Sequence, residues 1–174
     1  VVGSGSLFSE SFNVICFQPY NCTDFTDPSY DLPAFIDLFS RWSDTKQDRW
    51  SMVAYATRNH LYKSSHSRTG LFADYTEFNG QPKSTSYNTN SHKYMYDAMR
   101  CSMNFGMDYY LFGADAERQE IMAQRLIGFF EEDNYEHARF NWDGSSPSES
   151  YTVGETGANA VACYCLLNNP EYER

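Results

Sequence analysis

Residues 93–112 place the strongest constraint on the fold, because they have the periodicity of one long amphipathic helix that ends at Gly113. Near its start this segment carries Asp97 and, three residues later, Arg100. Side chains three positions apart lie on the same face of a helix, so we expect the carboxylate and the guanidinium to contact each other. A helix N-terminus favours an ionised carboxylate, as a general base requires. A helix acid with a structural Arg partner has the same spacing, and spacing alone favours that simpler interpretation.

Helical periodicity recurs in four other segments, and long polar loops separate them. These segments are residues 32–42, 46–64, 116–131 and 156–168. Residues 12–17 have the pattern of a short strand, and Asn79-Gly80 is typical of a hairpin turn. Residues 1–11 are rich in Gly and Ser, so we expect a loosely ordered start. The sequence therefore predicts a mainly α protein that forms a single unit over residues 1–174.

The composition excludes two classes of partner. The net charge is −10 and the isoelectric point is about 4.7, so the chain lacks the clustered Lys and Arg that nucleic acids and anionic membrane surfaces require. No apolar run approaches the ~20 residues that span a bilayer. Aromatic residues make up 17% of the chain, and flat rings suit both a sugar-binding cleft and an aromatic core.

Motifs for bound metals and nucleotides are missing from the sequence. The four His residues have no spacing typical of a metal site, and the nucleophile elbow and phosphate-loop motifs do not occur. The sequence therefore predicts neither a metal nor a cofactor.

Five cysteines leave at least one unpaired. Cys16 and Cys22 are close enough in sequence to form a disulfide if the compartment is oxidising. Cys163 and Cys165 face different sides of a predicted helix and should not pair, while Cys101 has the surroundings of a packing residue. Asn21 begins a glycosylation sequon, which has meaning only in a secreted eukaryotic protein.

Four blocks of sequence resemble, in chain order, the motifs of one enzyme family. They are DPSYDLPAF (27–35), TGLFADYTEFNGQP (69–82), YDAMRCSMNFGMDY (96–109) and WDGSSP (142–147), the last followed by GANAVA (157–162). Together they resemble glycoside hydrolase family 8, and most closely its reducing-end xylose-releasing oligoxylanase branch. The resemblance covers residues 12–168 and implies an (α/α)6 barrel. The chain is similar to the C-terminal half of that barrel.

The resemblance implies an inverting hydrolase of β-1,4-linked xylan or xylo-oligosaccharides, with β-glucan and chitosan as alternatives. It makes Asp97 the general base and Arg100 the residue that orients it, since a nearby cation favours an ionised carboxylate. Tyr30 matches the tyrosine that holds the nucleophilic water. A core tyrosine bonded to backbone fits Tyr30 equally well.

Three further residues are candidates for substrate binding. Trp142 is expected to line a sugar subsite, and His92, just ahead of Asp97, to border the cleft. Asp27 is a third candidate, although an Asp before Pro28 is more typical of a turn.

Three other acids have simpler interpretations. We expect Asp143 to form a turn and Asp108 to be structural, while Glu155 fits either a helix start or the cleft. Residues 145–155 differ from the corresponding loop of the oligoxylanase branch, so the resemblance does not decide between exo and endo action.

The family's general acid lies in a Glu-Gly-Met-x-Tyr-Gly type motif that does not occur in this sequence. We therefore expect the chain to supply the base and a second chain or missing segment to supply the acid. The alternative is a non-catalytic carbohydrate-binding or self-assembling protein built on a hydrolase half-barrel, with an apolar face that binds a partner. The sequence starts without Met and without a signal peptide, as a processed or trimmed chain does. We expect a secreted or periplasmic protein, or a cytoplasmic one if it processes oligosaccharides.

Overall fold

The computed structural model describes residues 7–18, 22 and 24–168. Its α-helices are α1 (Pro33–Trp42), α2 (Gln47–Ser64), α3 (Arg100–Phe112), α4 (Ala116–Glu132) and α5 (Val153–Ala162). Short 3-10 helices are η1 (Pro28–Tyr30), η2 (Tyr96–Met99) and η3 (Cys163–Leu166). The strands are β1 (Phe25–Thr26), β2 (Thr76–Glu77), β3 (Lys93–Tyr94), β4 (His137–Asn141) and β5 (Ser148–Ser150). The mainly α fold class is therefore confirmed.

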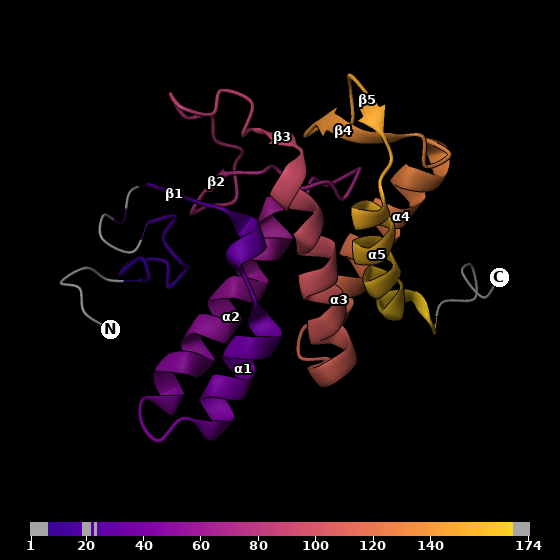
Figure 1. Cartoon of the computed structure of the whole chain (residues 1–174). Coiled ribbons are helices and arrows are strands. Elements are labelled where there is room, and N and C mark those ends of the chain that lie inside the picture. The colour runs from indigo at the N-terminus through magenta and orange to yellow at the C-terminus, as the bar shows by residue number, and fades with distance from the viewer. Residues whose placement is uncertain (1–6, 19–21, 23, 169–174) are drawn as a thin grey trace.

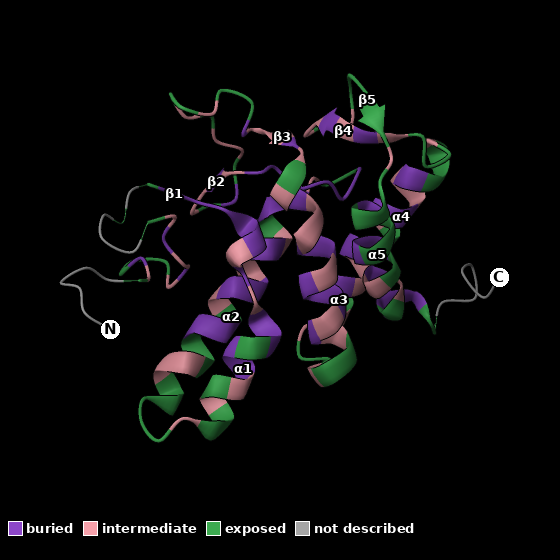
Figure 2. Ribbon diagram, viewed as in Figure 1, coloured by how far each residue is buried: buried purple, intermediate pink, exposed green. Residues whose placement is uncertain are grey.

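The helices pack side by side, with α3 in the middle (Figure 1). The α1–α2 hairpin lies on one side of α3, and α4 and α5 lie on the other. Helices α3 and α5 approach closely at Gly106, where an added Cβ would lie 2.4 Å from the carbonyl oxygen of Val161. Most of the buried side chains belong to the inner faces of these helices and to the segments above them (Figure 2).

Three of the predicted helices, α1, α2 and α4, begin and end within about one residue of their expected positions, because their hydrophobic periodicity defines them. The helix predicted for residues 93–112 is wrong at its start. Lys93 and Tyr94 instead pair with Asn141 and Phe140 as strand β3, and Tyr96 has a left-handed φ of 38° that no α-helix accepts. Asp97 thus lies in η2, one turn ahead of α3.

The helix predicted for residues 156–168 starts earlier and ends earlier than expected. Thr152 caps α5 by accepting a hydrogen bond from Gly154 N–H, and η3 follows directly after Ala162. The strand predicted for residues 12–17 is also wrong, because the backbone there forms a turn at Asn13 and only an isolated bridge between Phe8 and Ile15.

Backbone hydrogen bonds around this bridge pair residues 7–9 with residues 14–16. The described part of segment 1–11, which was expected to be loose, is therefore ordered. Residues 1–6 lie outside the described residues. The predicted turn at Asn79-Gly80 is confirmed, since Gly80 N–H donates to Glu77 O and Glu77 N–H donates to Gln81 O. The antiparallel sheet β3-β4-β5 has no counterpart among the elements predicted from the sequence.

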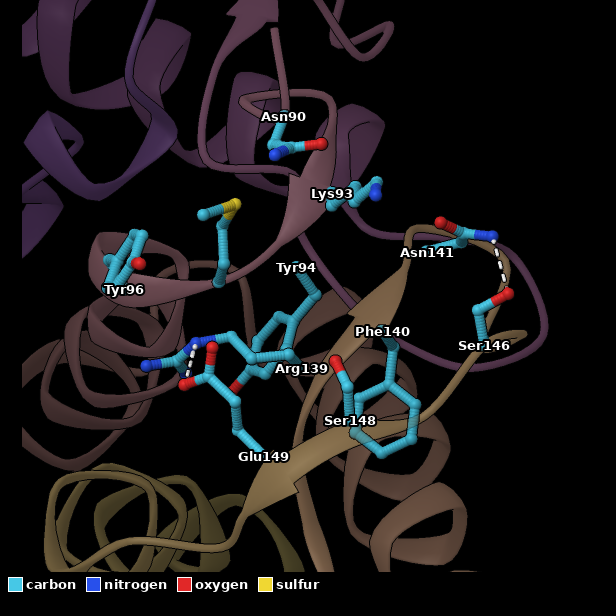
Figure 3. A pocket seen from close by; sticks show the side chains of 11 residues that line it. Asn90, Lys93, Tyr94, Tyr96, Arg139, Phe140, Asn141, Ser146, Ser148 and Glu149 are labelled. Atoms are coloured by element: carbon cyan, nitrogen blue, oxygen red, sulfur yellow. Dashed lines mark hydrogen bonds and ion pairs between the residues drawn. The ribbon is translucent and has the colours of Figure 1, made fainter. Parts of the chain in front are cut away.

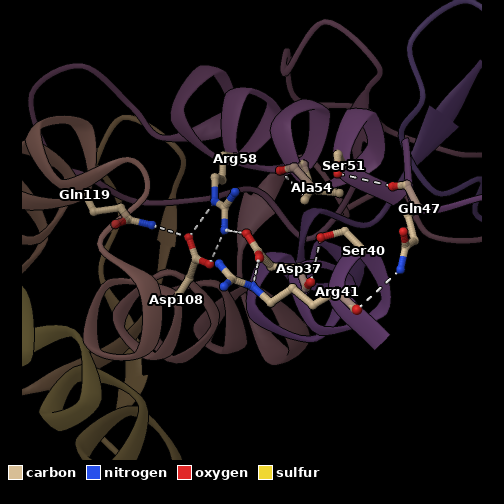
Figure 4. A network of polar contacts seen from close by, with 10 residues as sticks. Asp37, Ser40, Arg41, Gln47, Ser51, Ala54, Arg58, Asp108 and Gln119 are labelled. Atoms are coloured by element: carbon tan, nitrogen blue, oxygen red, sulfur yellow. Dashed lines mark hydrogen bonds and ion pairs between the residues drawn. The ribbon is translucent and has the colours of Figure 1, made fainter. Parts of the chain in front are cut away.

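A buried network joins four helices and consists of Asp37, Arg58, Asp108 and Gln119 (Figure 4). Arg58 donates two hydrogen bonds to Asp108, from Nε at 2.8 Å and from Nη2 at 2.7 Å, and Nη2 also reaches Asp37 at 2.7 Å. Gln119 donates to Asp108 at 2.6 Å. The prediction that Asp108 is structural is confirmed.

The cysteines follow the predicted pattern within the described residues. Cys16 and Cys22 form a disulfide, Cys101 is buried, and Cys163 and Cys165 are free. Asn21 of the sequon lies outside the described residues. Among the described residues, none of the helices has the length and apolarity that crossing a membrane would require.

Candidate functional site

The carboxylate of Asp97 lies just ahead of the N-terminal end of α3. Asp97 lies in η2, its side chain is 51% exposed, and its Oδ2 is 3.0 Å from Nη2 of Arg100. The predicted contact between these two residues is confirmed, although the pair spans a 3-10 turn and not an α-helix. Residues three apart also share one face of a 3-10 helix, so the spacing argument holds for both geometries.

Arg100 connects Asp97 to η1. Its Nη2 also donates to Ser29 Oγ at 2.8 Å and lies 3.7 Å from Oδ2 of Asp27. Asn104, one turn further along α3, donates to the carbonyl oxygen of Ser29 at 2.9 Å. The DPSY turn and the start of α3 therefore form one unit. We call Asp27, Asp74, Asp97 and Arg100 the site cluster.

Asp27 is a buried acid with one unused oxygen. It is 1% exposed, its Oδ1 accepts the Ser29 N–H at 2.7 Å, and its Oδ2 accepts no hydrogen bond from the described residues. Burial raises the pKa of Asp27 to about 7, and the charges of Asp74 and Asp97 add to the rise. The interpretation of Asp27 as a turn former is confirmed, since it caps η1. Its contact with substrate stays a prediction.

Asp74 is a site residue that the sequence analysis did not single out. It is 4% exposed, and its Oδ1 accepts the backbone N–H of Asp97 at 3.1 Å. Burial raises the pKa of Asp74 to about 6, and the nearby charge of Asp97 contributes. The signal in the sequence is an acid directly after Leu71-Phe72-Ala73, a run that is wholly buried.

Tyr30 is partly buried beside the site cluster. Its ring stacks on Phe17 with centroids 6.0 Å apart. Burial, followed by the charges of Asp27 and Asp97, raises the pKa of Tyr30, so its hydroxyl keeps its proton at neutral pH. The structure thus brings Tyr30 into the electrostatic neighbourhood of Asp97, and its contact with water stays a prediction.

Trp142 and His92 have contacts in other parts of the fold. The indole N–H of Trp142 donates to Ser64 O at 3.1 Å, and its ring meets His66 edge-on, both at the C-terminal end of α2. His92 Nδ1 lies 2.9 Å from Ser84 Oγ within the loop that precedes β3. Their roles in sugar binding stay predictions. Asp143 is a turn residue as expected, since its Oδ1 accepts the Ser145 N–H.

A polar pocket of about 180 Å³ has Tyr96 and Arg139 among its lining residues (Figure 3). Its walls come from β3, β4 and β5, and Tyr96, the neighbour of Asp97 in sequence, lines one side. The guanidinium of Arg139 lies 4.8 Å from the centre of the Tyr96 ring. Arg139 also binds Glu155 at 2.9 Å, and Glu155 is buried in the first turn of α5, which confirms its interpretation as a helix-start residue.

The site cluster gathers exposed and buried carboxyl groups around one guanidinium. An exposed carboxylate is oriented by a guanidinium and backed by two buried acids whose protonation changes between about pH 6 and 7. Within the described ranges, no group of three or more His, Cys, Asp or Glu could hold a metal ion.

Comparisons with known proteins agree with the geometry. The family model described as "Glycosyl hydrolases family 8" matches residues 18–172. A reducing end xylose-releasing exo-oligoxylanase of Halalkalibacterium halodurans is 29% identical over 151 residues, which cover 84% of this chain and 38% of that protein. The corresponding enzyme of Paenibacillus barcinonensis is 31% identical over 143 residues, which cover 79% of this chain and 37% of that protein.

Solved structures show the same helical arrangement. A family 8 xylanase of Teredinibacter turnerae, a catalytic mutant in complex with xylohexaose, aligns with a TM-score of 0.85 at 30% identity and covers 91% of this chain. The alignment takes in 41% of the xylanase chain, so this chain spans about two fifths of the length of its relatives. The fold is therefore a part of an (α/α)6 barrel, as predicted.

Proposed function

The chain belongs to glycosyl hydrolase family 8, and we propose that it supplies the general-base side of an inverting hydrolase that acts on β-1,4-linked xylo-oligosaccharides. The observation that carries the proposal is the exposed carboxylate of Asp97, held at 3.0 Å by Arg100 in the YDAMR block. The names of the oligoxylanase relatives support the choice of substrate.

Inversion needs two carboxyl groups on opposite sides of the scissile bond. In our proposal, Asp97 takes a proton from water while the water oxygen bonds to the anomeric carbon, and an acid gives a proton to the leaving oxygen. Arg100 directs the Asp97 carboxylate through the contact of 3.0 Å, and the Tyr30 hydroxyl holds the water. The acid must lie roughly 6.5–9.5 Å from the base, because the water occupies the space between them.

We propose that the acid comes from a segment outside these 174 residues, on the same polypeptide or on a second chain. We call this chain together with the acid-bearing half of a family 8 barrel the completed barrel. For experiments, the acid-bearing half can be taken from the Paenibacillus barcinonensis relative and expressed with this chain.

The exposed surface of the α1–α2 hairpin supports the proposal that a partner segment packs against this chain. Large apolar side chains lie exposed along the hairpin, and exposed residues are frequent on its outer faces (Figure 2). These side chains are Phe35, Phe39, Trp42, Met52 and Tyr55. The same surface favours the second candidate, a non-catalytic protein that self-associates or binds a partner through its half-barrel. The two candidates differ in whether the completed barrel hydrolyses a glycan.

We also propose that the protein is secreted or periplasmic. The disulfide between Cys16 and Cys22 supports this, since such bonds persist in oxidising compartments.

The function is tested by following hydrolysis of xylotetraose by the completed barrel with ¹H NMR of the anomeric protons. We expect the new reducing end to form first as the α-anomer and to equilibrate afterwards, because the attacking water arrives from the face opposite the leaving group. Cellotetraose and chitosan tetraose, run in parallel, distinguish the alternative glycans. A product that forms first as the β-anomer contradicts the mechanism, and hydrolysis of none of the three glycans favours the assembly protein.

A further inference from the structure

We propose that Asp74 is a positioning residue for Asp97: its carboxylate holds the backbone of the base and places a negative charge behind it. This inference rests on the proposed function and deepens it. Asp74 lies 23 residues before Asp97 in the chain, on the segment that leads into β2.

The contact replaces a missing helix cap. Met95, the residue before η2, makes no side-chain hydrogen bond to the free N–H groups of this turn. Asp74 Oδ1 accepts the Asp97 N–H at 3.1 Å from outside the helix. A carboxylate at this end of a helical turn is favourable, because the free N–H groups point toward it.

Asp74 is itself fixed in place. Its side chain is buried, and its backbone N–H donates to Lys93 O at 2.9 Å, while Tyr75 N–H donates to Ser91 O at 2.7 Å. These bonds attach the Asp74 segment to the strand that leads directly into η2. A displacement of Asp74 would therefore be transmitted to the backbone of Asp97.

The strained residue before Asp97 fits the same role. Tyr96 has a φ of 38°. This left-handed conformation costs a residue other than glycine about 1 kcal/mol or more, and it persists only where the surrounding structure holds it. Arg139 holds the Tyr96 ring on one side of the turn, and Asp74 holds the Asp97 N–H. The backbone that leads into Asp97 is thus held at the Tyr96 side chain and at the Asp97 N–H.

The charge of Asp74 acts on a small set of groups. Those that interact with it electrostatically, or face it from the packed elements, are Asp27, Tyr75, Asp97, Arg100 and Cys101. Burial raises the pKa of both Tyr75 and Cys101, so these two stay neutral, and Arg100 stays charged. Asp27 and Asp74, whose pKa values rise to about 7 and about 6, change charge near neutral pH. A carboxylate beside a negative charge holds a proton more firmly, so ionised Asp74 makes Asp97 a stronger base.

The test is the pH dependence of kcat for the completed barrel with Asp74→Asn. Asn keeps the size and an oxygen that accepts the Asp97 N–H, and it removes the charge. We expect the acidic limb of the profile to move to lower pH by about one unit, because the base loses a like-charged neighbour. Asp74→Ala also removes the hydrogen bond, and we expect a further loss in kcat of about tenfold with little change in KM.

Asp133→Asn is the matched control. Asp133 Oδ2 accepts backbone N–H bonds from Glu136 and His137 at 3.0 and 2.8 Å, the same type of contact, at the C-terminal end of α4. We expect it to leave the pH profile of kcat unchanged. Thermal unfolding of each variant reports loss of structure, and if Asp74→Ala does not fold, Asp74→Asn decides.

Asp97→Asn belongs in the same series, because it separates the two claims. If Asp97→Asn is inactive and the profile of Asp74→Asn coincides with that of Asp133→Asn, the role of Asp74 is refuted and the proposed function stands. If Asp97→Asn keeps the kcat of the parent protein, the proposed function fails and the inference fails with it. A shifted acidic limb in Asp74→Asn alone supports the inference.

Discussion

Two clusters of Asp and Arg side chains lie at α3, and they differ in how completely their carboxylate oxygens are bonded, although Gln119 Oε1 of the buried network also has no partner among the described residues. In the buried network, Arg58 binds both oxygens of Asp108 and one of Asp37, and Arg41 binds the other oxygen of Asp37 at 2.7 Å (Figure 4). In the site cluster, Asp27 Oδ2 and Arg100 Nε are buried without a hydrogen-bond partner among the described residues.

The pKa of Asp37 in the buried network and the pKa values of Asp27 and Asp74 in the site cluster move in opposite directions. Burial raises the pKa of Asp37, but hydrogen bonds from Arg58 and Arg41 outweigh burial, so the net pKa is lowered. In the site cluster, burial outweighs the available donors, and the pKa rises to about 7 for Asp27 and about 6 for Asp74. In the site cluster, the single guanidinium of Arg100 faces the three carboxyl groups of Asp27, Asp74 and Asp97.

The difference separates a structural role from a functional one. A buried ionic group whose bonds are complete stabilises a helix arrangement and has nothing left for a ligand. A group with unused bonding capacity and a displaced pKa beside an exposed carboxylate is typical of a reactive site. Three variants test this comparison, two by stability and one by activity.

The largest expected effect on stability is in the buried network. Asp108→Asn leaves Arg58 partly unpaired in the interior, so we expect the free energy of unfolding to fall by about 3–5 kcal/mol. Urea unfolding at pH 7 measures the loss. Asp24→Asn is the control, because its ion pair with Lys83 is largely exposed and contributes below about 1 kcal/mol. Equal losses in the two variants would show that the network is not structural.

A smaller effect of opposite sign is expected in the site cluster. The folded-state pKa of Asp27 is above its model value of 3.8, at about 7, so the folded state binds this proton more firmly than the unfolded state. The contribution of Asp27 to stability is therefore present at low pH and is lost as the pH rises from about 4 through about 7.

Asp27→Asn replaces the ionisable carboxyl group with a neutral amide, so the variant does not lose this contribution to stability as the pH rises. We expect the variant to match the parent protein at pH 4 and to exceed its free energy of unfolding at pH 8 by about 1–3 kcal/mol. Asn can still accept the Ser29 N–H, so the cap of η1 is kept. Urea midpoints at pH 4, 6 and 8 measure the difference. A variant that is less stable than the parent at pH 8 contradicts the comparison.

The sequence was sufficient to predict those parts of the fold and of the site that depend on interactions between residues close together in the chain. Periodicity and end signals defined α1, α2 and α4, and the three-residue spacing of Asp97 and Arg100 predicted their contact. The resemblance to family 8 located the DPSY and YDAMR blocks, which the structure joins through Ser29.

The sequence was insufficient to predict features that form where segments distant in the chain contact each other. Strand β3 forms because Tyr94 pairs with Phe140, more than 40 residues further along the chain. The periodicity of residues 93–112 does not reveal this pairing, so the helix was predicted to start too early. Asp74 was missed because its partner lies 23 residues away, and the raised pKa of Asp27 depends on burial that many segments create together.

The most direct test of the account is kcat for xylotetraose hydrolysis by the completed barrel, measured for the parent chain, Asp97→Asn and Asp133→Asn. We predict that Asp97→Asn lowers kcat by about 10²–10⁴-fold with an unchanged unfolding temperature, because it removes only the group that accepts the proton from water. Asp133→Asn should retain the kcat of the parent chain. If Asp97→Asn also retains that kcat, Asp97 is not the base.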